Sequence, residues 1–327
     1  MDRPEEPPLN GADQLHVVLG ATGGAGGSVV SELAGGGHRV RAVSRKPTAD
    51  LPEGVEQVAA DAADPAQTRT ACAGATVVYH CVQPPYQRWA AEFPTLTHSI
   101  ADAAAAAGAR LVYADNLYAY GPVHGPITED LPAQPTAKKG RIRALMAERL
   151  LAAHRSGTLQ VAIGRSSDYY GPGGANSVVG DILFGAAVKG NRARWMGRMD
   201  VPHSLNYLQD VARALIILGT RPEALGEIWH LPAAEPVTGR EFVELIAAAL
   251  GRPVKVTATS RLALRLAGLF DPRARETTEM LYQWERPFVL DASKFQRAFG
   301  PFEPTPHPQA VATTVAWFQE RAGRTRR

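Results

Sequence analysis

Three glycines recur at every third position in the segment VVLGATGGAGG, residues 17–27. The first permits a tight turn, the second lets a backbone approach a phosphate, and the third lets a helix lie close to the preceding strand. A helix N-terminus also presents unpaired N–H groups and a partial positive charge, which suit a pyrophosphate. The spacing therefore predicts a dinucleotide-binding turn, with a tight turn that binds no ligand as the alternative. The residues expected to contact the ligand are Gly20, Thr22, Gly23, Gly24, Ala25 and Gly26.

Polar side chains follow the next apolar segment, residues 38–45, which ends with Ser44 and Arg45 and is followed by Lys46. A carboxylate at this place would hydrogen-bond the ribose 2′-hydroxyl of NAD. A hydroxyl and two cations suit a 2′-phosphate instead, because arginine binds phosphate through two parallel hydrogen bonds. The pattern favours NADPH, with NADH or a solvent-facing basic strand end as alternatives. Asp61, which follows the third apolar segment, is expected beside the adenine or as a turn residue.

A regular alternation of short apolar segments and helical segments must position these residues. Apolar segments of this length, ended by glycine or polar residues, are typical of buried parallel strands. The alternation predicts an α/β fold, a doubly wound parallel sheet of the Rossmann type with helices on both faces. The expected strands lie at 15–20, 38–45, within 55–64, and at 75–82, 110–116, 159–165 and 227–232.

The domain organisation follows from a loss of this regularity after residue 171. We expect residues 13–171 and 206–232 to form the dinucleotide-binding domain, and residues 172–205 and 233–305 to form a smaller, discontinuous substrate-binding lid. Residues 1–12 are expected to be a disordered lead-in, and residues 306–327 a C-terminal helix with a basic tail. Thr238 and Glu241 have the spacing of a capping box and predict a helix start.

The composition excludes several classes of protein. The chain has 327 residues, of which 45% are hydrophobic, and a net charge of only +3, so nucleic acid is not an expected partner. No apolar run approaches the ~20 residues that a membrane helix needs, and the first residues contain no apolar signal segment. The two cysteines, Cys72 and Cys81, form neither a disulfide framework nor a metal-binding spacing. We expect a cytoplasmic protein that binds no metal.

The order and intervals of six motifs resemble the extended short-chain dehydrogenase/reductase superfamily, which contains nucleotide-sugar epimerases and dehydratases. The resemblance covers roughly residues 15–305 and rests on GATGGAG, ADAAD, VVYHCV, LVYADNLYAYG, RSSDYYGPG and YLQDVARAL. It implies a Rossmann fold, a nicotinamide dinucleotide, and homodimers formed through helices near 94–107 and 137–154. It also implies that the dinucleotide is lined by Gly20, Gly23, Gly24, Ala25, Arg45, Asp61, Ala62, Cys81 and Val82.

The catalytic residues of that superfamily are missing from this chain. Its members carry a Ser or Thr after the fifth strand and a Tyr-x-x-x-Lys on the next helix. The tyrosine protonates the substrate oxygen. The lysine lowers the pKa of the tyrosine and holds the nicotinamide ribose. The chain contains no Tyr-x-x-x-Lys. With Glu148 as the landmark, the three positions fall on Gly140, Ala144 and Asn116, so the chain resembles an atypical member.

Three residues are candidates to replace the missing groups. The position of Tyr118 resembles one that carries an active-site acid/base side chain in the dehydratase branch of the superfamily. Tyr118 could protonate a substrate oxygen if a nearby cation lowers its pKa. Asn116 could hold that oxygen through its amide. Arg141 lies three residues before Ala144 and could share its helix face, as could the two lysines at the helix entrance. The alternatives are a packing aromatic for Tyr118 and solvated cations on the helix.

Gln83, Tyr169 and His203 are the expected substrate contacts. Tyr169, with its neighbour Asp168, follows the sixth strand where the superfamily's substrate loop begins, and a histidine at the lid junction could titrate near neutral pH or be structural. The sequence favours an NADPH-dependent oxidoreductase acting on a small-molecule carbonyl or enone. The alternatives are a non-redox isomerase, cyclase or dehydratase on the same scaffold, and a non-catalytic NADP(H)-binding sensor.

Overall fold

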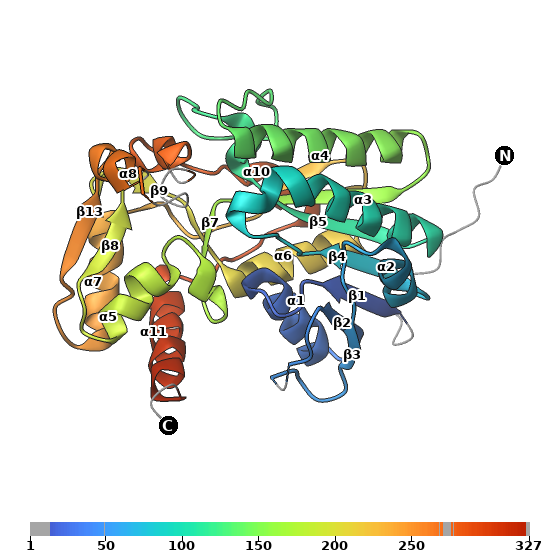
Figure 1. Ribbon diagram of the computed structural model, residues 1–327, viewed down its shortest axis with the longest axis horizontal. Coiled ribbons are helices and arrows are strands. Elements are labelled where there is room, and N and C mark those ends of the chain that lie inside the picture. The colour runs from blue at the N-terminus through green and yellow to red at the C-terminus, as the bar shows by residue number, and fades with distance from the viewer. Residues whose placement is uncertain (1–13, 49, 268, 271–275, 277, 325–327) are drawn as a thin grey trace.

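The computed structural model describes residues 14–48, 50–267, 269–270, 276 and 278–324 (Figure 1). The expected disordered lead-in, residues 1–12, and the end of the expected basic tail, residues 325–327, lie outside the described residues. No helix within the described part is both long and apolar enough to cross a bilayer.

A seven-stranded, fully parallel sheet forms the larger part of the molecule, which confirms the predicted doubly wound architecture. The strand order is β11-β6-β5-β4-β1-β2-β3, so the chain reverses its direction of winding between β1 and β4. In such sheets ligands bind at the carboxyl ends of the strands beside this reversal. The strands are β1 (Leu15–Leu19), β2 (Arg39–Ser44), β3 (Glu56–Ala59), β4 (Val77–His80), β5 (Arg110–Asn116), β6 (Gln160–Ser166) and β11 (Ile228–His230).

Helices cover both faces of the sheet (Figure 1). One core contains Val17 and Leu19 of β1 together with side chains from α2 (Pro65–Cys72), α3 (Trp89–Ala106) and α4 (Lys138–Arg155). The other contains Val18 with side chains from α1 (Gly24–Gly35) and α6 (Leu208–Thr220). Successive strand residues therefore enter opposite cores, which is why the central strands β1 and β4 are buried along their whole length.

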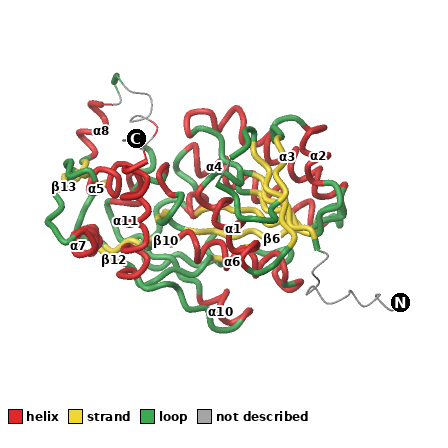
Figure 2. Tube along the Cα trace, turned by 90° about the horizontal axis from the view of Figure 1, so that it is seen from below, coloured by secondary structure: helices red, strands yellow, loops and turns green. Residues whose placement is uncertain are grey.

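A smaller region lies at one end of the sheet (Figure 2). It contains three two-stranded pairs, β7 (Asp168–Tyr170) with β10 (Leu205–Tyr207), β8 (Ala193–Met196) with β13 (Val256–Thr259), and β9 (Pro202–His203) with β12 (Val237–Thr238). Its helices are the π-helical turn η4 (Gly180–Gly185), α5 (Ala186–Val188), α7 (Gly239–Leu250), α8 (Arg261–Ala267) and α11 (His307–Arg324). The predicted capping box is present at the start of α7, where Thr238 and Glu241 bond reciprocally.

The structure differs from the expected domain boundaries in two places. Helix α10 (Ser293–Phe299) lies within the expected lid, yet Phe295 and Phe302 pack into the sheet core beside α6. Helix α11, expected as a separate terminal segment, contributes Ala310 and Phe318 to the core of the smaller region. An apolar stripe predicts that a helix is packed but not which core receives it.

Three buried histidines make the fold sensitive to acid. His16, His80 and His230 are 0% exposed, and burial lowers their pKa values to about 4, 3 and 3. Below about pH 6.5 the unfolded chain binds protons that the folded chain does not, so stability falls as the pH falls towards 4. Each histidine should contribute roughly 1.4 kcal/mol per pH unit in that window. Urea unfolding at several pH values measures this slope; His80→Gln should reduce it, whereas His98→Gln, whose side chain is 75% exposed, should not.

Candidate functional site

The predicted glycine turn lies at the carboxyl end of β1 and requires glycine at two positions. Gly20 has a φ of +87°, and a Cβ there would lie 2.7 Å from the carbonyl oxygen of Cys81. A Cβ on Gly26 would collide with the carbonyl oxygen of Gly20. These glycines let α1 begin directly above β1 and β4, beside the reversal of the sheet.

The N-terminus of α1 has the features of an anion site. Its N-cap is Gly23, which has no side chain to bond the first-turn N–H groups. Thr22 and Gly23 are exposed, while Gly24 and Ala25 are half-buried behind them. Uncapped N–H groups and the helix dipole both favour a negative ligand at this place. The residues present therefore fit the pyrophosphate of a dinucleotide.

Two free cations stand beside this turn. The backbone of β2 reaches it through a hydrogen bond of 3.0 Å from Gly20 N to Val43 O. Ser44 follows and donates its hydroxyl to the carbonyl oxygen of Lys46. Arg45 and Lys46 are exposed, and neither forms an ion pair with any residue that the structure describes. Their charges are thus available to a phosphate on the adenosine ribose.

The remaining predicted cofactor residues follow β3 and β4, at the same edge of the sheet as the glycine turn. Asp61 is exposed and accepts a hydrogen bond of 3.0 Å from the backbone of Ala63, so it acts as a turn residue in this structure. Ala62 is buried, and Cys81 and Val82 are half-buried after β4. Burial raises the pKa of the Cys81 thiol to about 12, which makes it part of an apolar wall rather than a nucleophile.

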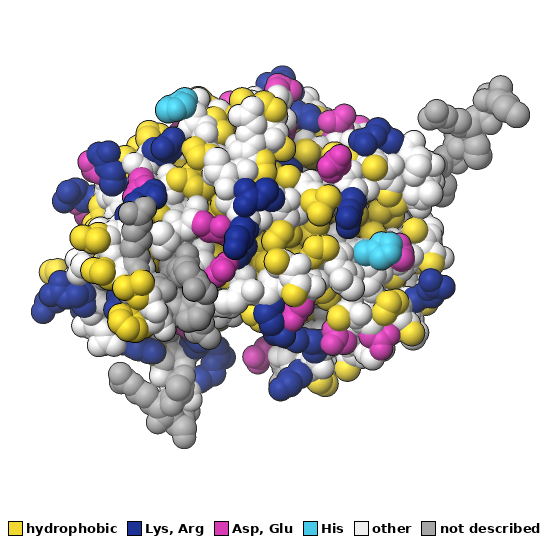
Figure 3. Space-filling view, turned by 45° about the horizontal axis from the view of Figure 1, so that its top comes forward, with side chains coloured by type: hydrophobic (Ala, Val, Ile, Leu, Met, Phe, Trp, Pro, Cys, Tyr) yellow, Lys and Arg dark blue, Asp and Glu magenta, His cyan; other side chains and the backbone are white. Residues whose placement is uncertain are grey.

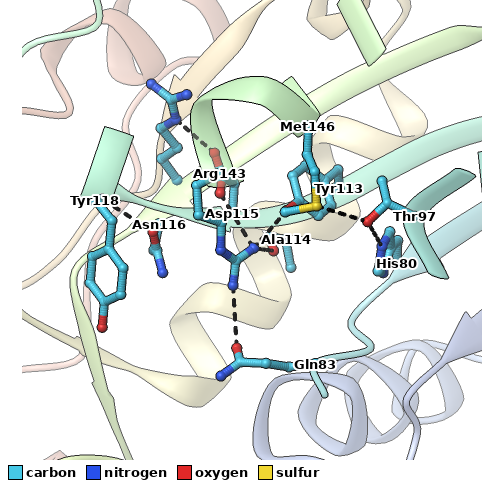
Figure 4. A network of polar contacts seen from close by, with 11 residues as sticks. His80, Gln83, Thr97, Tyr113, Ala114, Asp115, Asn116, Tyr118, Arg143 and Met146 are labelled. Carbon is cyan, nitrogen blue, oxygen red and sulfur yellow. Dashed lines mark hydrogen bonds and ion pairs between the residues drawn. The ribbon is translucent and has the colours of Figure 1, made fainter. Parts of the chain in front are cut away.

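Asn116 and Tyr118 come together where β5 runs into the 3₁₀ turn η2 (Leu117–Tyr120). The side-chain oxygen of Asn116 accepts a hydrogen bond of 3.1 Å from the backbone of Tyr118, which leaves its NH₂ group as a donor. Figure 4 shows both side chains directed to the same side of the strand end. Burial raises the pKa of Tyr118 well above its ordinary value, and although Arg143 acts to lower it, burial dominates. The hydroxyl of Tyr118 is therefore a neutral donor, not an acidified one.

The buried face of α4 includes Gly140, the expected tyrosine position, but not Arg141. A Cβ on Gly140 would collide with the carbonyl oxygen of Tyr118, so no tyrosine fits there. Arg141 points to solvent and donates to the carbonyl oxygen of Thr136, and it is not brought to Tyr118. Lys139 and Arg143 occupy the buried face instead, with side chains only 4% and 3% exposed. Lys139 is one of the two lysines at the helix entrance that were expected to reach inward. Arg143, four residues further on the same helix face, is the residue that sequence reasoning missed.

Arg143 links α4 to the ends of β4 and β5 (Figure 4). It donates to the hydroxyl of Tyr113 at 2.7 Å and to the side-chain oxygen of Gln83 at 3.3 Å. It also lies 3.4 Å from Asp115, whose other oxygen binds Arg165 at 2.8 Å. Gln83, an expected substrate contact, is thereby tied to the buried face of α4.

Four side chains form what we call the tyrosine–aspartate cluster: Tyr86, Tyr118, Asp168 and Tyr282. They come from η1 (Tyr86–Arg88), η2, β7 and η6 (Leu281–Trp284). The hydroxyls of Tyr86 and Tyr118 interact, and Asp168 acts to raise the pKa of all three tyrosines, in addition to the larger effect of burial. Tyr86, Tyr118 and Tyr282 also pack together in one apolar cluster.

The other two expected substrate contacts lie around this cluster. Nε2 of His203 donates to Oδ2 of Asp168 at 2.9 Å, and the His203 ring stacks on Trp284 with centroids 3.9 Å apart. Tyr169 is half-buried on the other side of Asp168, and burial raises its pKa to about 12. Among the described residues, no group of three or more His, Cys, Asp or Glu side chains is arranged to hold a metal ion.

Comparisons with known proteins point to one family. The model of the "NAD dependent epimerase/dehydratase family" matches residues 16–231. The 2′-dehydrokanamycin reductase of Streptomyces kanamyceticus is 31% identical over 271 residues, which cover 77% of this chain and 69% of that protein. An uncharacterized protein, y4nL, of Sinorhizobium fredii is 28% identical over 258 residues, 71% of each chain.

Solved structures share the fold. MoeE5 in complex with UDP-glucose and NAD has a TM-score of 0.76 and 21% identity, covering 94% of this chain and 99% of that one. A double mutant of DesIV, a dTDP-glucose 4,6-dehydratase from Streptomyces venezuelae with NAD and DAU bound, has a TM-score of 0.76 and 20% identity, covering 95% and 98%.

Proposed function

Because the chain belongs to the NAD dependent epimerase/dehydratase family, we propose that it is an NADPH-dependent reductase acting on the carbonyl group or enone of a small molecule. The observation that carries this proposal is the pair of neutral donors, Asn116 and Tyr118, presented together at the end of β5. A relative named as a reductase, at 31% identity, supports the reaction class.

The chain's own groups have distinct tasks in this proposal. The first-turn amides of α1 hold the pyrophosphate, and Arg45 with Lys46 neutralises the 2′-phosphate. When bound, the dinucleotide supplies a hydride to the carbonyl carbon, and the C=O electron pair moves onto oxygen. Asn116 and Tyr118 hold that oxygen, and Tyr118 transfers its proton to it, because an alkoxide is more basic than a phenolate. The product is the alcohol.

The function is tested by incubating the protein with NADPH and a panel of ketones and enones, including sugar-ring ketones. Loss of the near-ultraviolet absorbance of NADPH together with alcohol formation supports the proposal. Product formation without NADPH consumption would favour an isomerase, cyclase or dehydratase instead. Cofactor binding without any product from the panel would favour a sensor.

Replacing Arg45 by alanine is expected to weaken NADPH binding about tenfold to a hundredfold, since a charged hydrogen bond contributes about 1.5–3 kcal/mol. NADH affinity should stay unchanged, because NADH has no 2′-phosphate. Calorimetric titration with both cofactors measures the difference. Arg39→Ala, at the exposed start of the same strand, is the matched control and should alter neither affinity. An equal loss for both cofactors would assign Arg45 to another contact.

We propose that Arg143 is the cation that α4 offers to the nicotinamide ribose, where related proteins use lysine. Arg143→Met should weaken NADPH binding about tenfold, because a charged donor beside Gln83 is lost. It should also lower the free energy of unfolding, as Tyr113 and Asp115 lose a buried partner. Arg141→Met, two residues away on the exposed side, should change neither. Unaltered NADPH affinity in a folded Arg143→Met variant would remove this role.

A further inference from the structure

An exposed apolar stripe runs along α8 and the turn that follows it. Leu262 and Leu266 lie one helical turn apart, and Leu269 and Phe270 continue the spacing beyond the helix end. The side chains of these four residues are 56–90% exposed. Leu264, on the opposite side of α8, is 8% exposed and packs into the core of the smaller region. The helix is therefore anchored by one side and shows apolar side chains to solvent on the other, which marks a contact surface.

The chain segments around α8 carry an excess of positive charge. Residues 182–199 and 245–270 each contain four Lys or Arg residues and no Asp or Glu, although the whole chain has 35 basic and 32 acidic residues. Two of these cations, Arg198 and Arg261, pair with carboxylates. The others include a set that we call the basic group, whose exposed side chains form no ion pair with any residue that the structure describes: Lys189, Arg192, Arg194, Arg252 and Lys255.

The pairing of β8 with β13 holds the basic group next to the start of α8. Arg194 is in register with Thr257, and Arg192 donates to the hydroxyl of Thr257 at 3.2 Å. Since β13 ends at Thr259 and α8 begins at Arg261, Thr257 lies only about 7 Å along the strand from the end that leads into α8. Figures 1 and 2 show the strand pair and α8 at the same end of the molecule, and apolar and basic side chains adjoin at that end in Figure 3. The stripe and the basic group therefore belong to one surface.

An anionic membrane surface matches both features at once. Negatively charged headgroups attract exposed Lys and Arg side chains, and the layer just below them accepts leucine and phenylalanine. Nucleic acid would neutralise the cations but would leave the apolar stripe in water. A second copy of the chain would cover the stripe but would bring two basic groups together, which repel each other. A contact of this kind lies on the bilayer surface and needs no spanning helix.

We propose that this end of the smaller region docks on anionic membranes, with the apolar stripe inserted below the headgroups and the basic group against lipid phosphates. The inference goes beyond the proposed reduction and is independent of it. Asn116 and Tyr118 lie on β5 and η2 of the sheet domain and contribute no side chain to this surface.

The test is flotation of the full chain with vesicles, measured with and without anionic lipid. Vesicles of phosphatidylcholine that contain about 30% phosphatidylglycerol are expected to bind at least tenfold more strongly than vesicles of phosphatidylcholine alone, since each cation near an anionic surface contributes about a fivefold gain. Raising the salt to about 1 M should remove most of this difference, because the Debye length falls to about 3 Å.

Two variants separate the apolar and the charged parts of the contact. Phe270→Gln should weaken binding to the anionic vesicles about tenfold, because one large side chain no longer leaves water. Leu145→Gln, at an exposed leucine of α4, is its control. Arg194→Gln combined with Lys255→Gln should weaken binding about twentyfold. The pair Arg149→Gln and Arg155→Gln, exposed on α4, removes the same charge elsewhere and should keep the binding.

Four results would overturn the inference. They are no binding to either kind of vesicle, equal binding to both, undiminished binding by a stripe or basic-group variant that melts like the wild type, and a dimer in solution that Phe270→Gln dissociates. The last result would assign the stripe to self-association. The proposed reduction is judged separately, by NADPH consumption in the absence of vesicles, so either proposal can fail while the other stands.

Discussion

Tyr118→Phe is expected to lower kcat/KM about a hundredfold, because a positioned general acid contributes typically 10²–10⁴-fold. The hydroxyl that this change removes belongs to a side chain packed in the same cluster as Tyr86, and burial keeps it protonated by raising its pKa. The ring itself, which packs against Trp89 with centroids 6.2 Å apart, stays in place. NADPH affinity should therefore change little. Steady-state rates with the best ketone of the panel, together with calorimetric titration of NADPH, separate the two effects.

Tyr120→Phe is the matched control for that result. Tyr120 is buried two residues away on the same turn, and its hydroxyl is 2.8 Å from Nε2 of His230. Losing this bond should lower the free energy of unfolding by about 1–3 kcal/mol while leaving kcat/KM of the folded enzyme nearly unchanged. A wild-type rate in the Tyr118→Phe variant, or an equal loss of rate in both variants, would end the assignment of Tyr118 as the acid.

Gly23→Asp is expected to weaken NADPH binding by at least about two orders of magnitude without destabilising the fold. Gly23 is exposed and is the N-cap of α1, a position where aspartate is among the preferred residues. Its carboxylate would cap the N–H groups that the pyrophosphate needs and repel the phosphates at a few ångströms, roughly 3–4 kcal/mol near a protein surface. A negative charge suits a helix N-terminus, but a Cβ at Gly23 would lie 3.3 Å from the carbonyl oxygen of Gly20, a tight contact that offsets part of this gain. The melting temperature should therefore stay close to that of the wild type.

Gly23→Asn separates charge from space in this experiment. Asparagine caps the helix as well as aspartate does but carries no charge, so its loss of NADPH affinity should be much smaller. Calorimetric titration gives the NADPH affinity of each variant, and thermal unfolding gives its melting temperature. Undiminished NADPH binding by the folded Gly23→Asp variant would show that the dinucleotide does not use the N-terminus of α1.

The strands and the glycine turn could be predicted because their signals are local. Each buried strand is a short apolar run, and β5 begins and ends at the residues that the sequence indicates. The turn needs glycine at Gly20 for its positive φ and at Gly26 for close packing, so the spacing itself encodes the geometry.

The inward face of α4 could not be predicted in the same way. Counting back from Glu148 assigns the catalytic positions to Gly140 and Ala144. Gly140 lies on the buried face, but the cations on that face are Lys139 and Arg143, each one residue earlier. The register is set by the contact of Gly140 with the backbone of η2, a segment about twenty residues earlier in the chain. The two buried cations, Lys139 and Arg143, are compensated by ion pairs with carboxylates on other segments, Glu276 and Asp115. No local pattern reports such partners.

The tyrosine–aspartate cluster could be predicted only in part. Tyr118 and Asp168 follow consecutive sheet strands, β5 and β6, and parallel strands bring their carboxyl ends together. Tyr282 comes from η6, more than a hundred residues after Asp168, in a part of the chain without a motif. Only the packing of the smaller region against the strand ends places its hydroxyl in the cluster.

The most direct test of the proposed reductase is the transfer of deuterium to product from NADPH that carries deuterium at both C4 positions. With a ketone that the protein converts, we predict one deuterium on the carbinol carbon of each alcohol formed, in equal amount to the NADPH oxidised, as measured by mass spectrometry and NMR. Product that carries no deuterium while the labelled NADPH is recovered unchanged would contradict the account.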